Sequence, residues 1–303
     1  MAISRSQLVK ELEPGLNALF GLEYKRYDNQ HAEIYTTESS DRAFEEEVML
    51  SGFANAQVKG EGAGVSFDEA QETFTARYSH ETVALAFAIT EEAIEDNLYD
   101  RLASRYTKAL ARSMSNAKQV KSVEPLINGL PTTDAFDSGD GVSLFNTAHP
   151  TVAGSFANTL ATQADLNETS LEQSLIDIAA MTDERGLRIA ARGVKMIIPS
   201  ELQFTAERLM KSQGRTGTAD NDVNAIVSMG MVPQGYRVNN YLTDSDAFYI
   251  LTDVPNGMKM FNRAPLTTAM EGDFDTGNVR YKARERYSFG VSDPRGIFGV
   301  EGS

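Results

Sequence analysis

Residues 41–89 constrain the fold of this chain more than any other segment, because they have the pattern of two strands around a glycine-rich tip. After this tip, apolar residues alternate with polar or small ones. They are Phe74, Ala76, Tyr78, Val83, Leu85, Phe87 and Ile89. A period of two is typical of strands with one buried face. The tip itself is Gly60-Glu-Gly-Ala-Gly64, preceded by Lys59. Since so many side chains of this hairpin are small or polar, it cannot bury much apolar surface against itself. The segment therefore needs another surface on which to lie.

The next stretch, from Thr90 to about Val120, predicts a long amphipathic helix. Thr90 is a favourable N-cap, and the two glutamates that follow it place negative charge in the first turn. Apolar residues then recur at steps of three and four, which predicts one buried face. The expected core residues of this helix are Ile94, Leu98, Leu102 and Tyr106, followed by Ala109 and Leu110. Pro125 and Gly129 are expected to end the pattern.

The remaining chain predicts a mixed α+β protein. Residues 1–40 are interpreted as an extended arm with one or two helical turns, broken at Pro14-Gly15. Two capping boxes, Thr169–Glu172 and Ser200–Gln203, precede predicted helices, and a strand is expected at Val194–Ile198. Residues 259–300 are rich in strand patterns. A chain of 303 residues can hold two domains or one domain with long excursions.

Composition excludes several classes of protein. The formal net charge is −15, and the chain has no basic tail and no continuous Lys/Arg block, which argues against direct reading of nucleic acid. There is no cysteine, so disulfide frameworks and thiolate chemistry are excluded. No apolar run approaches the roughly 20 residues of a membrane helix, and the first residues lack the apolar core of a secretory signal. These features are typical of a protein that folds in a reducing cytoplasm.

Motifs for catalysis are weak. His31, His80 and His149 have no metal-binding spacing, and we expect His149 to cap backbone carbonyls in a loop. The aspartates at 134, 137 and 140 are interpreted as a solvated loop, with weak cation binding as the alternative. We therefore expect no catalytic, cofactor-binding or metal-binding residue. One alternative stays open, a hydrolase that uses paired carboxylates in the central region, because sequence alone cannot pair 43 acidic residues.

Two longer motifs carry a family resemblance. The first is Leu144-Phe-Asn-Thr-Ala-His149-Pro150, with Asn158 and Leu160 beyond it. We expect Leu144 and Phe145 of this motif to face inward. The second is the closing Tyr281-Lys-Ala-Arg-Glu-Arg-Tyr-Ser-Phe-Gly290-Val-Ser-Asp-Pro-Arg-Gly296. With the order of arm, hairpin, long helix, central α/β region and β-rich end, the chain resembles the tailed-phage major capsid proteins of the Hong Kong 97 fold. The resemblance is closest to the Mu-type major head subunit group.

That resemblance implies a domain plan. Its parts are an N-terminal arm at 1–40, an extended loop at 41–89, a peripheral domain at 90–125 and 259–303 with the long helix as its spine, and an axial domain at 126–258. It also implies a homo-oligomer of capsomers and shell, assembled in the host cytoplasm with a separate scaffolding protein, a portal and a decoration protein, with no membrane and no sequence-specific nucleic-acid binding. Lys59, Gly60, Gly62 and Gly64 become the expected contacts between subunits.

Two questions stay open within the resemblance. Some members join a loop lysine to an asparagine of a neighbour, and Lys59 stands where such a lysine could sit. The sequence identifies neither the asparagine nor an assisting glutamate, and an exposed lysine is the simpler interpretation. An encapsulin-like cargo shell shares the fold and is the nearest alternative function.

Overall fold

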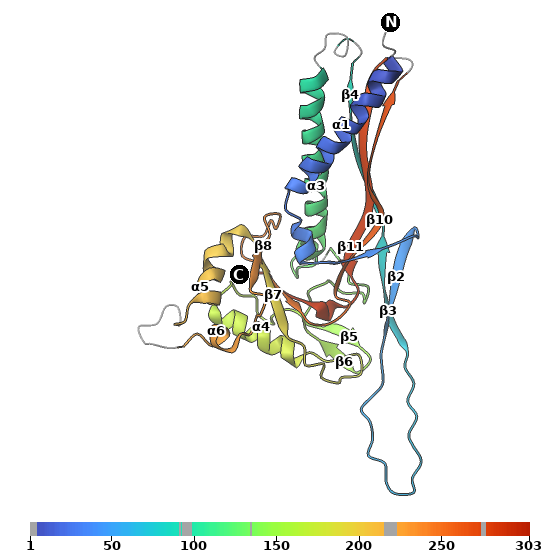
Figure 1. Cartoon of the computed structure of the whole chain (residues 1–303). Coiled ribbons are helices and arrows are strands. Elements are labelled where there is room, and N and C mark those ends of the chain that lie inside the picture. The colour runs from blue at the N-terminus through green and yellow to red at the C-terminus, as the bar shows by residue number, and fades with distance from the viewer. Residues whose placement is uncertain (1–4, 91, 93–98, 134, 215–222, 274–276) are drawn as a thin grey trace.

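The computed structural model describes residues 5–90, 92, 99–133, 135–214, 223–273 and 277–303. It has an elongated part and a rounder part, and a hairpin projects from the elongated part (Figure 1). Outside the two large sheets and the main helices lie several short elements: η1 (Gln30–Glu33), β5 (His149–Thr151), β6 (Gly154–Phe156), η2 (Ser200–Leu202), α6 (Ala225–Met229) and η3 (Pro294–Gly296). In the described part of the chain, no helix has the length and apolarity needed to cross a membrane.

The elongated part is built on a long four-stranded sheet of order β1-β10-β11-β4. Its strands are β1 (Thr36–Ser39), β10 (Met258–Gly272), β11 (Val279–Val291) and β4 (Glu81–Ile89). β11 pairs antiparallel with both β10 and β4, and β1 adds parallel to β10. The β10–β11 register shifts twice, between Asn262 and Ala264 and between Ala264 and Thr267. The second interval contains Pro265, which cannot donate a hydrogen bond to the ladder.

Two helices cover one face of this sheet, α1 (Arg5–Arg26) and α3 (Tyr99–Asn128) (Figure 1). Their apolar core joins Leu16, Phe20, Leu110, Met114, Tyr281 and Ala283. The prediction that Pro14 breaks the N-terminal segment is wrong, because α1 continues through it. Burial of Leu16 and Phe20 against this core stabilises the residues that follow the proline. α3 likewise continues past Pro125, whose carbonyl accepts a hydrogen bond from the amide of Gly129.

The rounder part contains the second four-stranded sheet, of order β12-β9-β7-β8. Its strands are β12 (Ile297–Val300), β9 (Phe248–Thr252), β7 (Gly193–Ile198) and β8 (Tyr236–Val238), and its helices are α4 (Glu168–Ala180) and α5 (Gln203–Lys211). The N-cap of α4 is Asn167, which forms a reciprocal capping box with Ser170, so the predicted box at Thr169–Glu172 lies two residues too late. Ser200 opens a 3₁₀ turn that leads into α5 and does not cap it.

The hairpin is formed by β2 (Phe44–Leu50) and β3 (Glu72–Ser79), which pair antiparallel. Residues 51–71 form its loop, and the carbonyl of Gly60 accepts the amide of Ala63 at the tip. Gly62 has a φ of 76°, a conformation that favours glycine. The predicted hairpin of residues 41–89 is therefore too long. β4 belongs to the long sheet instead, since Val83, Leu85, Phe87 and Ile89 align with β11.

Candidate interaction surfaces

The loop and outer stem of the hairpin expose an unusual amount of apolar surface. Its exposed large apolar side chains are Phe44, Val48, Leu50, Phe53, Val58, Val65 and Phe67. Val58 is 100% exposed and Phe67 is 98% exposed. Figure 1 shows that the loop extends away from both sheets. A contiguous exposed apolar segment of this kind is typical of a surface that binds another macromolecule.

The four predicted contact residues lie together at the end of this loop. Lys59, Gly60, Gly62 and Gly64 are all exposed, and the only hydrogen bond among the described residues that involves one of them is the turn between Gly60 and Ala63. What these residues contact stays a prediction.

The stem of the hairpin, in contrast, is firmly attached to the long sheet. Lys259 Nζ lies 2.6 Å from Glu47 Oε1 and 3.3 Å from Glu38 Oε1, and its side chain is 7% exposed. Tyr78 is buried, its hydroxyl is 2.5 Å from Ser292 Oγ, and its ring packs edge-on against Phe261 at 4.8 Å. The structure thus holds the base of the hairpin rigidly while the loop reaches outward.

A second contact fixes the part of the loop that leads into β3. The guanidinium of Arg185 donates a hydrogen bond of 2.5 Å to the carbonyl of Glu69 and lies 3.8 Å from the carboxylate of Asp68. Asp68 also accepts the amides of Ala54 and Glu69, and these hydrogen bonds lower the pKa of its carboxyl. Residues beyond this point, toward the tip, have no such anchor among the described contacts.

The predicted core of the long helix is only partly testable. Ile94 and Leu98 lie outside the described residues, as does the side chain of Leu102. Tyr106 is described, and it is 48% exposed, with its ring 5.7 Å from that of Phe87. Its assignment to the core is therefore wrong for the single subunit. The buried positions of α3 begin instead with Ala103, Thr107, Leu110, Ala111 and Met114.

The segment around His149 forms a buried polar centre rather than a catalytic site. His149 Nδ1 lies 2.6 Å from Asp140 Oδ2, and Nε2 lies 3.0 Å from Asn158 Oδ1. The predictions that His149 caps backbone carbonyls and that Asp140 is solvated are both wrong, because both side chains are buried. Burial alone would raise the pKa of Asp140, but hydrogen bonds from His149 and Ser138 outweigh it and hold that pKa below its usual value.

Asn158 connects this centre to the rest of the molecule. Its side-chain amide donates to the carbonyls of Leu144 and Pro294, at 2.7 and 3.1 Å. Its backbone carbonyl accepts the amide of Gly299 at 3.0 Å. The predicted inward orientation of Leu144 and Phe145 is confirmed, since both are 0% exposed. The two sequence motifs, far apart in the chain, therefore meet here.

The closing motif contributes a buried ion-pair group to the same region. Arg295 binds Glu184 at 2.7 Å and Asp293 at 3.2 Å, and its guanidinium lies 4.1 Å from the ring of Phe156. Phe156 also stacks on His149, with the ring centroids 4.8 Å apart. These contacts fix the turn before β12 and leave no side chain of the centre open to solvent for chemistry.

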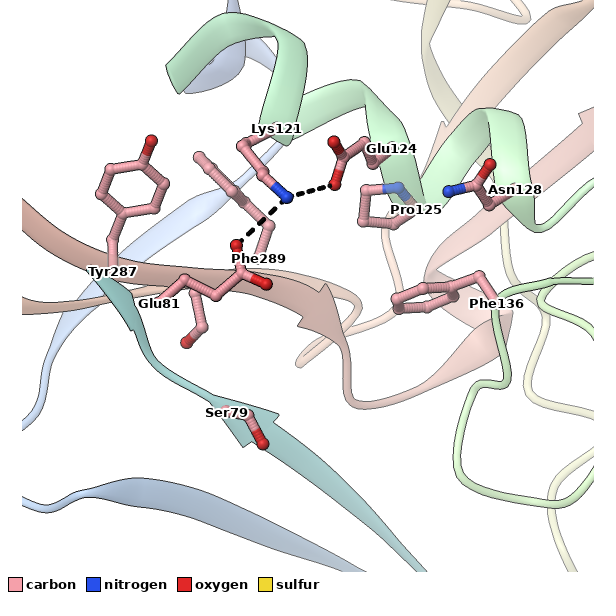
Figure 2. Close-up of a pocket in the computed structure, with 10 residues that line it drawn as sticks. Ser79, Glu81, Lys121, Glu124, Pro125, Asn128, Phe136, Tyr287 and Phe289 are labelled. Atoms are coloured by element: carbon pink, nitrogen blue, oxygen red, sulfur yellow. Dashed lines mark hydrogen bonds and ion pairs between the residues drawn. The ribbon is translucent and has the colours of Figure 1, made fainter. Parts of the chain in front are cut away.

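Charged groups also gather in a pocket between α3 and the long sheet (Figure 2). Lys121 Nζ lies between two carboxylates, 3.1 Å from Glu81 and 3.0 Å from Glu124. The rings of Tyr287, Phe289 and Phe136 line the remaining wall. Because both carboxylates bind the same ammonium group, the arrangement is an ion-pair network and not an acid/base pair.

Paired carboxyls do occur elsewhere, at Asp244 and Asp246. Burial raises the pKa of Asp244, and the neighbouring Asp246 raises it further. They lie two residues apart in one turn, whereas a hydrolase of the paired-carboxylate type places its two groups on opposite sides of the bond that it breaks. In the described part of the chain, no three His, Asp or Glu side chains are arranged to hold a metal ion.

Comparison with known proteins agrees with this architecture. Residues 72–300 match the model of a family described as phage capsid protein. No curated protein matches the sequence. Among solved structures, a virus-like particle from Pyrococcus furiosus is 11% identical, with a TM-score of 0.53 over 94% of this chain and 98% of that one. The capsid of Myoviridae phage XM1 is 12% identical, with a TM-score of 0.52 over 89% of each chain. A structure from Mycobacterium phage Adephagia is 13% identical, with a TM-score of 0.52 over 91% of each. At such identities the likeness concerns the fold alone.

Proposed function

Because the chain belongs to the phage capsid protein family and has its mixed α+β Hong Kong 97 fold, we propose that it is the major capsid subunit of a tailed bacteriophage. In this role it assembles into pentamers and hexamers of an icosahedral shell that encloses double-stranded DNA. Head-to-tail contacts that rotate and close generate such rings. We assign it, within the family, to the Mu-type subgroup on its Leu144–Pro150 motif.

The single observation that carries the proposal is the projecting hairpin. Its stem is anchored through Lys259 and Tyr78, whereas its loop exposes Phe53, Val58, Val65 and Phe67 to solvent. An apolar loop of this size is stabilised when a neighbouring subunit covers it, at about 25 cal/mol per Å² of buried apolar area, less the cost of ordering the loop.

The structural parts then take the following roles. Residues 44–79 are the extended loop that lies over a neighbour. The long sheet with α1 and α3 is the peripheral domain, and residues 126–258 are the axial domain at the five- and six-fold centres. β12 pairs with β9, so we now place the last strand in the axial domain rather than with the rest of residues 259–303.

The same proposal assigns partners. A separate scaffolding protein, a portal and a decoration protein complete the head, and assembly takes place in the host cytoplasm. The subunit is not an enzyme in this proposal, which the ion-paired state of Glu81 and Glu124 and the buried state of His149 support.

A second candidate is a cargo shell built on the same fold. The observation that favours it is the likeness to the virus-like particle, whose chain is covered over 98% of its length. The two functions differ in content: a phage head holds a genome, whereas a cargo shell holds protein.

Electron microscopy of the purified protein tests the proposal. We expect capsomers, tubes or closed shells on addition of scaffolding protein or on raising the salt concentration, since salt screens the repulsion between subunits with a charge of −15. A protein that stays monomeric under all these conditions would exclude a shell function. Particles from the natural source that contain a single enzyme and no DNA would favour the cargo shell.

A further inference from the structure

His80 lies where the chain leaves the hairpin and enters the long sheet, and the proposed function does not use it. β3 ends at Ser79 and β4 begins at Glu81, so His80 is the single residue between them. Its side chain is buried, with 9% exposed. Ser40 lies at the other crossing, between β1 and β2. His80 and Ser40 therefore occupy the two places where the chain passes between the long sheet and the hairpin.

Hydrogen bonds join the two crossings to each other and to the long sheet. His80 Nε2 lies 2.9 Å from Ser40 Oγ, and His80 Nδ1 lies 2.9 Å from Oγ of Ser288 in β11. The amide of Ser40 donates to the carbonyl of Asn262 in β10 at 3.1 Å. We call His80, Ser40 and Ser288 the hinge cluster. Because it connects both crossings to the sheet, the hinge cluster fixes the direction in which the hairpin projects.

The partners of Ser40 determine which nitrogen of His80 carries the proton. Ser40 Oγ lies 2.7 Å from Oε1 of Glu45, and a carboxylate only accepts. Since the one hydroxyl proton of Ser40 is donated to Glu45, Ser40 accepts its other hydrogen bond from Nε2–H of His80. In the neutral ring, Nδ1 is then the acceptor of the hydroxyl of Ser288. A second proton on Nδ1 removes this acceptor, and the described residues offer the Ser288 hydroxyl no other side-chain partner.

The charges around the ring also oppose a second proton. Burial lowers the pKa of His80, Arg286 of β11 and Arg263 of β10 lower it further, and Glu45 of β2 acts in the opposite direction. Nε of Arg286 is buried without a hydrogen-bond partner among the described residues. A protonated His80 thus places a second positive charge beside a guanidinium group in a poorly solvated site.

The pocket of Figure 2 gives solvent access to the hinge cluster. Ser79 and Glu81, the two neighbours of His80 in the chain, line this pocket together with Ser288. On the side of α3, Lys121 is already paired with Glu81 and Glu124. The pocket therefore brings solvent close to the partner of Nδ1, the atom that takes the second proton.

We propose that the hinge cluster is a pH-sensitive latch, which holds the hairpin in one direction while His80 is neutral and releases it in mild acid. Protonation breaks the bridge between the two crossings. The hairpin keeps the stem contacts of Lys259 and Tyr78 and can change direction about them. Since the pKa of His80 is lowered from 6.5, the latch is closed at neutral pH and opens as the pH falls below 6.5.

The latch deepens the proposed function and rests on it, because it names a condition that regulates the extended loop. Figure 1 shows that the hairpin is attached to the long sheet only at its base, so a small change of angle at the hinge cluster moves the loop over a long path. Subunits at neutral pH then present the loop in one direction, and subunits in mild acid present it in several.

Distances between two spin labels on the unassembled subunit test the inference. The chain has no cysteine, so Leu50→Cys at the outer end of β2 and Lys282→Cys in β11 give a single labelled pair at exposed positions. When the pH is lowered from 7.5 to 5, the distance distribution measured by double electron–electron resonance should become roughly twofold wider, and it should narrow again when the pH is raised. His80→Gln has an amide donor and acceptor but takes no proton, so it should keep the narrow distribution at both pH values.

Two further variants show whether the ring itself is responsible. Ser288→Ala keeps the ring and removes the donor to Nδ1, so it should move the response to a higher pH. His31→Gln removes the titration of another buried histidine and should leave the response unchanged. Nitrogen-15 NMR of the three histidines, with His80 identified by its loss in His80→Gln, should show the neutral ring protonated on Nε2 and a titration that coincides with the widening.

The outcomes separate failure of the latch from failure of the proposed function. A distribution that stays narrow while His80 titrates, or that widens equally in His80→Gln, overturns the latch and leaves the shell function intact. A response that Ser288→Ala does not move also overturns the latch. A subunit that shows the full response and never assembles overturns the shell function alone, because the labels are read on the single subunit.

Discussion

His149 and Asp140 form a buried, charge-assisted contact in which Nδ1 and Oδ2 are 2.6 Å apart and neither side chain is more than 2% exposed. On the other side of the ring, Nε2 faces the side-chain oxygen of Asn158. The three residues tie the loop before β5 to the loop after β6 and, through Asn158, to the C-terminal strand. The centre acts on the packing of the subunit, and its removal should be measurable as lost stability.

We expect His149→Ala to lower the free energy of unfolding by about 3–5 kcal/mol, because it leaves the carboxylate of Asp140 buried without its main donor. Adding Asp140→Asn to this variant should recover part of the loss, because a neutral amide leaves no buried charge without a partner. Urea denaturation of the two single variants and the double variant measures the coupling. Strictly additive losses would contradict a direct interaction between the two side chains.

Gly299 supports the same region through the absence of a side chain. A Cβ at this position would lie 2.6 Å from two ring carbons of Phe145, which is itself fully buried and packs against Tyr249. Gly299→Ala should therefore destabilise the subunit by about 1–3 kcal/mol through overpacking. Gly21→Ala in α1 is the matched control, because nothing lies within 4 Å of its Cβ position. That variant should be neutral or slightly more stable, as measured by thermal unfolding.

Stability should fall on acidification because of His31. Burial lowers the pKa of His31 to about 4 from an ordinary value of 6.5, and the nearby charge of Lys118 acts in the same direction. Between these values the unfolded chain binds a proton that the folded chain does not, so stability is lost as pH falls from 6.5 to about 4. The loss from this group is about 3 kcal/mol.

His31→Gln removes this titration and isolates the effect. Between pH 7 and pH 4 the unfolding free energy of the parent should fall by about 3 kcal/mol more than that of the variant, because only the parent carries the His31 titration. Parallel curves for the two proteins would show that the folded state tolerates a protonated His31. The hydrogen bond between Gln119 Nε2 and His31 Nδ1, 3.1 Å long, raises the pKa of His31, but by less than burial lowers it.

Local patterns were enough to predict a hairpin around Gly60–Gly64, a long helix and the inward orientation of Leu144 and Phe145, since each depends on residues close in sequence. It could not predict that β4 pairs with β11, almost 200 residues away, because pairing between distant strands leaves no local signal. The error at Tyr106 has a simple geometric cause. Successive residues of a helix are about 100° apart around its axis, so Tyr106, directly before the buried Thr107, lies at the edge of the face that Thr107 and Met114 bury.

The sequence contains signals for two structural features that were not predicted from it. Asp140, His149 and Asn158 are spaced at equal intervals of nine residues, which could have suggested that they meet. Four cations of β11, Arg280, Lys282, Arg284 and Arg286, escape a search for continuous Lys/Arg blocks, because they alternate with Tyr281, Ala283 and Glu285. A search for charge with a period of two along a predicted strand finds them.

The buried face of α3 can be tested directly. Met114 is 1% exposed and belongs to the core between the helices and the long sheet. Met114→Ala should cost about 2–5 kcal/mol of unfolding free energy, whereas Tyr106→Ala, at a half-exposed position, should cost less than about 1 kcal/mol. Equal losses from the two variants, measured by urea denaturation, would place the core face of α3 elsewhere.

Deletion of Lys59–Gly64 separates folding from assembly. These residues are exposed, and their one described hydrogen bond lies within the deleted turn, so their loss removes no contact with either sheet. We expect the deletion to change the melting temperature by no more than about 2 °C, since surface changes cost little, and to impair shell formation, because the shortened loop reaches less far over a neighbour. Calorimetry and electron microscopy of the same sample measure both effects. A deletion that unfolds the subunit would mean that the tip packs on its own chain, and one that leaves assembly unchanged would confine the contact between subunits to the residues nearer the stem, such as Phe53 and Phe67.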